Sequence, residues 1–109
     1  MKGYVYLLTD GEQYKVGVTR GSIDKRIAKL QTGNPYTIQM IDCYETDAPF
    51  TIEKILHFRY SDKRVNNEWF DLSNEDVKNF KSNCEKIENM LESLKDNPYF
   101  TRVNSKTGW

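Results

Sequence analysis

The sequence contains few cysteines, a single histidine and no long run of apolar residues. Cys43 and Cys84 stand far apart, without a CxxC pair or a Cys/His cluster, which argues against a zinc site. No segment approaches the roughly 18–20 apolar residues that span a bilayer. The first residues lack the apolar core and cleavage site of a signal peptide, so we expect an intracellular protein whose cysteines are thiols.

Positive and negative charges balance over the whole chain, with 16 of each, but they are unevenly distributed. Residues 1–40 carry six basic side chains and three acidic ones. These basic residues are Lys2, Lys15, Arg20, Lys25, Arg26 and Lys29. If the protein binds a polyanion, this part of the chain supplies the surface, although an ordinary solvated surface explains the pattern about as well.

The apolar pattern predicts an α+β domain with a three-stranded antiparallel sheet, beginning with a β-hairpin and flanked by three helices. Asp10-Gly11 is typical of a two-residue type I′ hairpin turn. Ser22 and Gly33 are typical residues for the two ends of a helix. The expected strands cover residues 3–9, 13–19 and 37–45, and the expected helices cover 23–32, 48–60 and 74–95.

The last predicted helix, 74–95, has a regular apolar face that allows two interpretations. It packs on its own domain, or it forms the contact of a homodimer.

Residues 61–67 have the composition of a polar loop. The segment Glu68–Leu72 has the composition of a short extended segment. We assign residues 1–95 to one domain and 96–109 to a C-terminal tail whose aromatic side chains can stack on bases.

A two-residue turn would place Tyr6 opposite Lys15 and Tyr4 opposite Gly17, with all four on one face of the hairpin. An ammonium beside a phenol favours the phenolate, which can take a proton from water. Gly17 would leave the strand bare, so that an anionic ligand can approach it closely. The alternative is an ordinary Tyr–Lys pair that reaches into water.

Two further groups have the chemistry of phosphate and metal binding. Lys25 and Arg26 lie near the N-terminus of the first predicted helix, which favours anions. Glu53 and His57 are four residues apart on the second predicted helix, so their side chains lie on the same face of it. The carboxylate of Glu53 can hold a divalent cation. Alternatively, Lys25 and Arg26 are ordinary surface residues, and Glu53 and His57 form only a surface hydrogen bond.

Five strings occur in order along residues 3–72: GYVYLL, KVGVTR, RIAKLQTGNP, IEKILHFRY and NEWF. Together they resemble the GIY-YIG endonuclease superfamily, and within it the branch of short phage, viral and bacterial open-reading-frame DNA-binding domains. The resemblance implies a three-stranded antiparallel sheet flanked by helices. It also implies the cytoplasm of a cell or of an infected host as the location.

The resemblance places Tyr6 at the tyrosine of the first family motif, Tyr4-Val5-Tyr6. Lys15 begins the second motif, Lys15-Val16-Gly17, where many members have tyrosine. Arg26 matches the catalytic arginine and Glu53 the metal-binding glutamate. The features typical of the branch are His57 and the segment Glu68-Trp69-Phe70. A late substrate-positioning asparagine has no clear counterpart, since Asn66 and Asn67 are both candidates.

The implied activity is hydrolysis of a DNA phosphodiester with one Mg²⁺ or Mn²⁺ per site. Glu53 would hold the metal, Tyr6 assisted by Lys15 would be the general base, and Arg26 would stabilise the phosphate. The secondary catalytic candidates are Tyr4 and His57. The candidates for DNA contact are Arg20, Lys25, Lys29 and Gly17. The alternative is a DNA-binding module on the same fold that does not cut.

Overall fold

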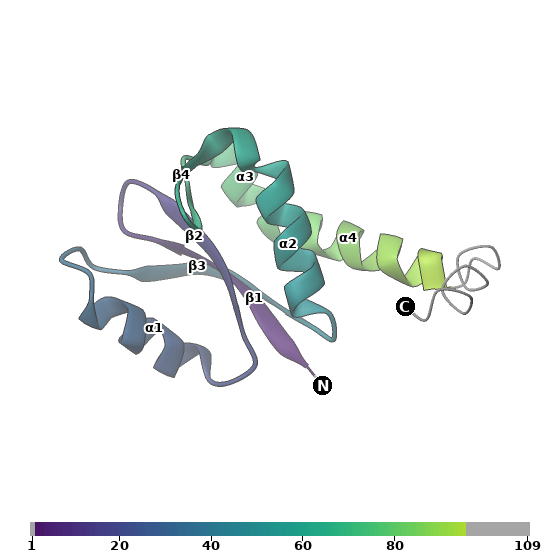
Figure 1. The fold of residues 1–109 in the computed structure, drawn as a ribbon, viewed down its shortest axis with the longest axis horizontal. Helices are drawn as coiled ribbons and strands as arrows, with labels where there is room; N and C mark the ends of the chain where they lie inside the picture. Colours follow the sequence, from purple (N-terminus) through teal and green to yellow (C-terminus); the bar gives the residue numbers. More distant parts are fainter. Residues whose placement is uncertain (1, 96–109) are drawn as a thin grey trace.

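The computed structural model describes residues 2–95, and a five-stranded antiparallel sheet lies at its centre (Figure 1). The strands are β1 (Gly3–Thr9), β2 (Tyr14–Thr19), β3 (Gln39–Thr46), β4 (Arg64–Asn66) and β5 (Trp69–Phe70), in the spatial order β3-β1-β2-β5-β4. The prediction of a three-stranded sheet is therefore wrong. The segment predicted as a polar loop contains β4, whose three side chains are all exposed, Val65 included, and show no alternation of buried and exposed positions at the sheet edge.

Four α-helices accompany the sheet instead of the three predicted. They are α1 (Ile23–Thr32), α2 (Pro49–Arg59), α3 (Asn74–Lys78) and α4 (Phe80–Lys95), and a 3₁₀ turn, η1 (Ser61–Lys63), follows α2. The long helix expected over 74–95 is divided at Asn79, where the first segment ends. Ser73 and Asp76 form a capping box at the start of α3, and Ser22 caps α1 by accepting a hydrogen bond from Lys25 N.

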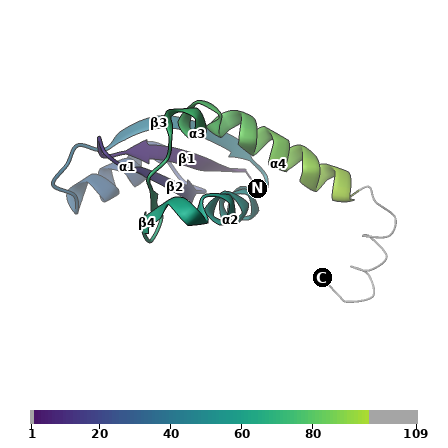
Figure 2. The same ribbon diagram turned by 90° about the horizontal axis from the view of Figure 1, so that it is seen from above.

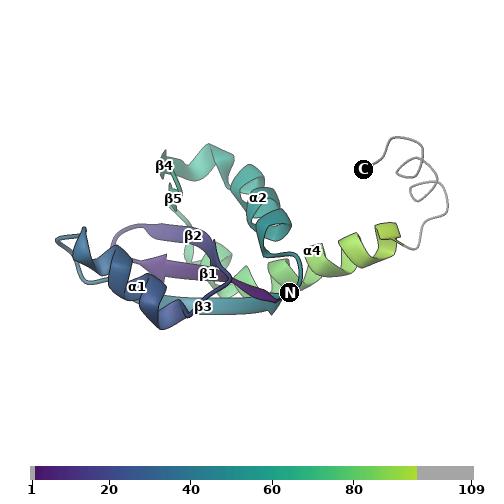
Figure 3. The same ribbon diagram turned by 60° about the horizontal axis from the view of Figure 1, so that its bottom comes forward.

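The two faces of the sheet carry different helices (Figures 2 and 3). On one face Val5, Leu7 and Val16 pack against α2 and α4 in the larger apolar cluster. On the other face Tyr6 and Leu8 join Ile38 in a smaller cluster, against which residues of α1 pack. Because successive side chains of a strand alternate between faces, β1 contributes to both cores. The strand that lies between the two helical layers is therefore buried on both sides.

The hairpin register differs from the prediction by two residues. Tyr6 pairs with Gly17 and Leu8 with Lys15, so Lys15 does not lie opposite Tyr6. The turn is longer than two residues because the Asp10 carboxylate accepts hydrogen bonds from the backbone N–H groups that follow it, at 2.9 and 2.8 Å. Since the shift is an even number of residues, each side chain keeps its predicted face.

Helix α4 packs on its own domain. Phe80, Cys84 and Ile87 are fully buried in the larger cluster, which accounts for its apolar face. The structure gives no support to a homodimer through this helix.

Cys43 and Cys84 are free thiols. No helix within residues 2–95 is long and apolar enough to cross a membrane, and the predicted tail at 96–109 lies outside the described residues.

Candidate functional site

Tyr6 and Arg26 form the first contact of the site. Tyr6 is 1% exposed on β1, and its phenol oxygen accepts a hydrogen bond from Arg26 Nε at 3.2 Å. The bond joins the sheet to α1, on which Arg26 is half-buried. Because Nε makes this bond, the two terminal nitrogens of the guanidinium are left for an anion. The phenol is thus fixed beside a permanent positive charge.

Gly17 is required by the position of the Tyr6 ring. A Cβ atom on Gly17 would lie 2.4 Å from the phenol oxygen and 2.5 Å from the ring carbon that carries it. Real Cβ atoms do not approach other atoms so closely, so a larger residue would displace the ring. The prediction that Gly17 leaves the strand bare for a ligand is therefore wrong. The space over Gly17 holds Tyr6, whose hydroxyl lies across β2.

Lys15 is bound to a carboxylate that the sequence analysis did not connect with it. Its ammonium forms an ion pair with Glu68 Oε2 and lies 5.9 Å from the centre of the Trp69 ring. The Lys15 side chain is 9% exposed, so its charge needs a counterion. The predicted partnership of Lys15 with Tyr6 is wrong, because the register brings Lys15 to β5 and the residue before it.

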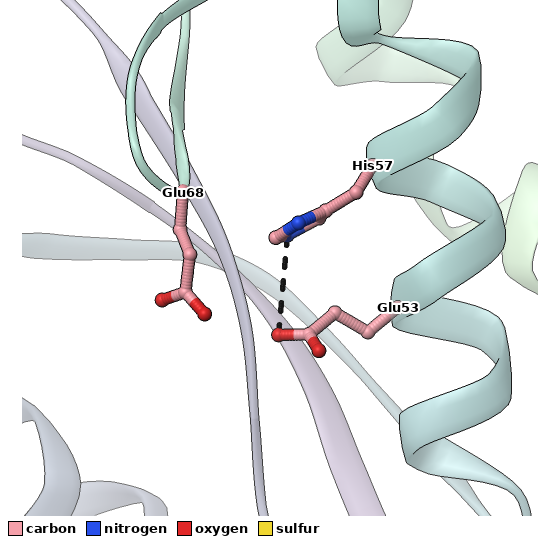
Figure 4. A group of neighbouring side chains, drawn as sticks. All are labelled: Glu53, His57 and Glu68. Carbon is pink, nitrogen blue, oxygen red and sulfur yellow. Dashed lines mark ion pairs between the residues drawn. The ribbon is translucent and has the colours of Figure 1, made fainter.

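Glu53, His57 and Glu68 form the third part of the site (Figure 4). Each offers one potential ligand atom, and these atoms all lie within 4.8 Å of one another. Glu53 Oε2 lies 3.9 Å from His57 Nε2, as expected from their spacing on α2. Glu68 approaches from the segment between β4 and β5, and Figure 4 shows its carboxylate directed toward the gap in front of α2.

Burial raises the pKa of the Glu53 carboxyl above its usual value. His57 is the strongest influence that opposes this rise, and the positive charges of Lys15 and Arg26 also oppose it, while the negative charge of Glu68 adds to it. Two carboxylates that share a partly buried gap repel each other, and a divalent cation between them would relieve the repulsion. The donor set therefore fits the Mg²⁺ or Mn²⁺ that the family resemblance implies, since both ions prefer carboxylate oxygen.

His57 is held by the sheet. Its Nε2 lies 2.8 Å from the carbonyl oxygen of Val16, and its ring packs edge-on against Phe70 at 5.1 Å between centroids. A carbonyl oxygen only accepts hydrogen bonds, so Nε2 carries the proton. This nitrogen has no free lone pair for a metal or for a proton of water. His57 therefore fixes α2 against the open edge of β2.

The remaining predicted residues have other partners or are exposed on α1. Tyr4 donates a hydrogen bond to Glu45 Oε2 at 3.2 Å, which raises the pKa of its phenol and directs it toward β3. Lys25 and Lys29 are exposed on α1. Arg20 lies 5.2 Å from the centre of the Phe50 ring. Tyr4 makes no contact with the Glu53 cluster among the described interactions. Lys25 and Lys29 lie on the helix that carries Arg26, whereas Arg20 contacts α2 through Phe50.

The two candidate asparagines lie in the turn that leads to Glu68. Asn66 ends β4 and is exposed, and Asn67 has a positive φ of 49°. The turn places Glu68 beside β2, where its carbonyl accepts a hydrogen bond from Val16 N at 3.2 Å. Glu68 is the site residue to which the sequence analysis gave no role. The sequence signal that could have identified Glu68 is its position directly before Trp69 and Phe70, the two residues that pair with β2.

A search against protein-family models matches residues 3–85 to the T5orf172 domain. Comparison with curated proteins and with solved structures gave no match. The T5orf172 domain is a GIY-YIG-like phage open-reading-frame family with a nuclease-like fold, associated with nuclease-like activity or DNA binding. The match covers both layers of the structure and every residue of the site described above. The chain belongs to the T5orf172 domain family.

Proposed function

We propose that this domain is an endonuclease of the GIY-YIG type that hydrolyses phosphodiester bonds of DNA with the help of one Mg²⁺ or Mn²⁺. The observation that carries the proposal is the position of Arg26, which donates a hydrogen bond to the buried phenol of Tyr6 and interacts electrostatically with Glu53 and Glu68. These two carboxylates are suited to a divalent cation. The proposal also agrees with the nuclease-like character of the family.

Tyr6 would accept the proton of the attacking water. Only the deprotonated oxygen can do so, and the hydrogen bond from Arg26 Nε fixes the position of this oxygen. Arg26 is therefore the cation beside the phenol, the place that the sequence analysis gave to Lys15. Its two terminal nitrogens would bind the scissile phosphate and stabilise the charge that develops there.

Glu53 would hold the divalent cation. When bound, this cation would polarise the phosphate and stabilise the leaving oxygen. His57 would act through Val16, by keeping α2 and its carboxylate at the edge of β2. The exposed Lys25 and Lys29, with Arg20, would contact DNA phosphates near the site. Since the chain has no net charge, we expect DNA affinity to be modest and to fall with salt.

The test is nicking of supercoiled plasmid with Mg²⁺, with Mn²⁺ and with EDTA. Wild-type protein should nick only with metal. Tyr6→Phe keeps the ring and removes the hydroxyl, and Glu53→Gln keeps the shape and removes the charge, so both should remain folded and inactive. Tyr14→Phe and Glu12→Gln are the matched controls and should nick normally. Binding of DNA without metal-dependent nicking by the wild type would instead identify a DNA-binding module.

A further inference from the structure

We propose that Glu68 is a second carboxylate ligand of the divalent cation, and that the ammonium of Lys15 is its counterion whenever no cation is bound. The inference rests on the proposed function, because it concerns the metal that Glu53 would hold. It adds Glu68 to the metal ligands and identifies the Lys15 ammonium as a cation that competes with the metal for Glu68. It predicts that metal affinity depends on a residue outside α2.

The first argument is geometric. Glu53 and Glu68 come from elements on either side of the same gap, and their ligand atoms lie within 4.8 Å (Figure 4). Mg²⁺ binds oxygens at about 2.1 Å, so two carboxylate oxygens on one ion lie within roughly 4.2 Å of each other. The upper limit of 4.8 Å is near enough that small side-chain movements would bring both carboxylates onto one ion.

The second argument concerns His57, the third member of the cluster. Its Nε2 donates to the carbonyl of Val16, so this nitrogen cannot bind a metal while α2 keeps its place. His57 could therefore offer only its Nδ1, and the oxygen ligands in the gap are the carboxylates of Glu53 and Glu68, completed by water. This is a set for a hard cation such as Mg²⁺ or Mn²⁺, whereas zinc and other borderline metals favour imidazole and thiolate.

The third argument concerns charge. Glu68 is 40% exposed, so one side of its carboxylate is accessible while Oε2 binds the nearly buried ammonium of Lys15. A buried ammonium without a counterion is costly, which explains why Lys15 holds Glu68 next to Glu53. Lys15 thus balances one of the two negative charges. A divalent cation that binds both carboxylates must share Glu68 with Lys15 or displace it.

Two opposite effects on metal binding follow. Lys15→Met removes the competing charge and keeps most of the stem, so affinity for Mn²⁺ should rise by about tenfold. Glu68→Gln removes a ligand charge, so affinity should fall by roughly 10–100-fold, as for other carboxylate partners of metal sites. Glu12→Gln, which changes an exposed carboxylate in the β1–β2 turn, should leave affinity unchanged.

The experiment is a titration of the full chain with Mn²⁺ in the absence of DNA, followed by electron paramagnetic resonance. Glu68→Gln leaves Lys15 without its counterion and could destabilise the fold. The decisive comparison is therefore Lys15→Met against the double variant Lys15→Met/Glu68→Gln, in which no ammonium is left unpaired. Weaker binding by the double variant supports Glu68 as a ligand. Equal binding overturns the inference.

The outcomes separate this inference from the proposed function. If Glu53→Gln abolishes Mn²⁺ binding while the two Lys15 variants bind equally, Glu53 holds the metal alone and the role of Glu68 is wrong. If the wild type binds no Mn²⁺, or if Glu53→Gln binds as the wild type does, the metal site itself is wrong and both proposals fail. A Lys15→Met protein with unchanged affinity refutes the competition.

Discussion

Replacing Gly17 by alanine is the most direct test of the way the site is built. The added Cβ would lie 2.4 Å from the Tyr6 hydroxyl oxygen, 2.5 Å from the carbon that carries it and 2.7 Å from one further ring carbon. A phenol ring is rigid, and this one is buried against Leu8 and Ile38. It cannot yield without moving its neighbours or releasing the hydrogen bond from Arg26.

The expected cost follows from this geometry. Overpacking of a buried site typically costs about 1–3 kcal/mol, and we expect Gly17→Ala to lower the free energy of unfolding by this amount. The hydroxyl of Tyr6 would also leave its place, so plasmid nicking should be lost together with the stability. The control is Gly33→Ala, because a Cβ there meets no atom within 4 Å and its φ of −98° suits any residue.

The free energy of unfolding, measured by urea denaturation, tests whether the Tyr6 ring causes this cost. The four proteins compared are the wild type, Gly17→Ala, Tyr6→Leu and the double variant. Leucine lacks the outer ring atoms that the new Cβ would meet. If the ring causes the clash, Gly17→Ala should cost at least 1 kcal/mol less in the Tyr6→Leu background, a coupling of the usual size for contacting residues (about 0.5–3 kcal/mol). An equal cost in both backgrounds would refute the close packing of Tyr6 over Gly17.

Three further predictions concern charge and reactivity. Arg26→Ala should lower the nicking rate by about 10²-fold or more, because a donor to the developing phosphate charge is lost, and single-turnover assays at saturating DNA would show it. The raised pKa of Glu53 means that the folded state binds its proton more tightly, so stability contributed by this group falls as pH rises above 4.5. In EDTA, the stability of Glu53→Gln relative to wild type should therefore increase from pH 4.5 toward neutral, and a constant difference would contradict the shift. Burial raises the pKa of Cys84 to about 12, so a thiol reagent should label the partly exposed Cys43 first and Cys84 only on unfolding.

The sequence predicted well those elements whose ends are fixed by neighbouring residues. The bounds of α1 agree with the prediction because Ser22 caps its first turn and Gly33 ends it. β1 also agrees, since its residues are apolar on both faces over its whole length. Helix 74–95 was predicted too long, because an apolar periodicity continues through the break at Asn79 and does not reveal it.

The missing strands and the wrong register have a common physical origin. β4 and β5 are three and two residues long. β5 is held by backbone pairing with β2, which is far away in the sequence, and β4 is held by pairing with β5. Side-chain patterns do not record such pairing. In the hairpin, the Asp10 carboxylate binds two backbone N–H groups and stabilises a longer turn than Asp-Gly alone suggests.

The site was predicted in part because an error of two residues preserves the face of each side chain. Tyr6 keeps its place on the α1 face in either register, so its approach to Arg26 does not depend on the predicted partner. Lys15 also keeps its face but meets different neighbours, and a buried ammonium must find a carboxylate. The family resemblance singles out the segment Glu68-Trp69-Phe70, but nothing in the sequence identifies Glu68 as the partner of Lys15. That partnership follows from the pairing of β2 with β5.

The arrangement also explains how helices on opposite faces of the sheet can serve one site. Arg26 belongs to α1 and Glu53 to α2, so the sheet stands between their helices. β2 pairs with β5 only at Tyr14 and Lys15, which leaves its edge from Val16 onward without a neighbouring strand in the described part of the chain. Because Gly17 has no side chain, the hydroxyl of Tyr6 can lie across β2 at this point. Under the proposed function, the open edge is therefore where a phosphate bound by Arg26 and a cation held by Glu53 would meet the phenol.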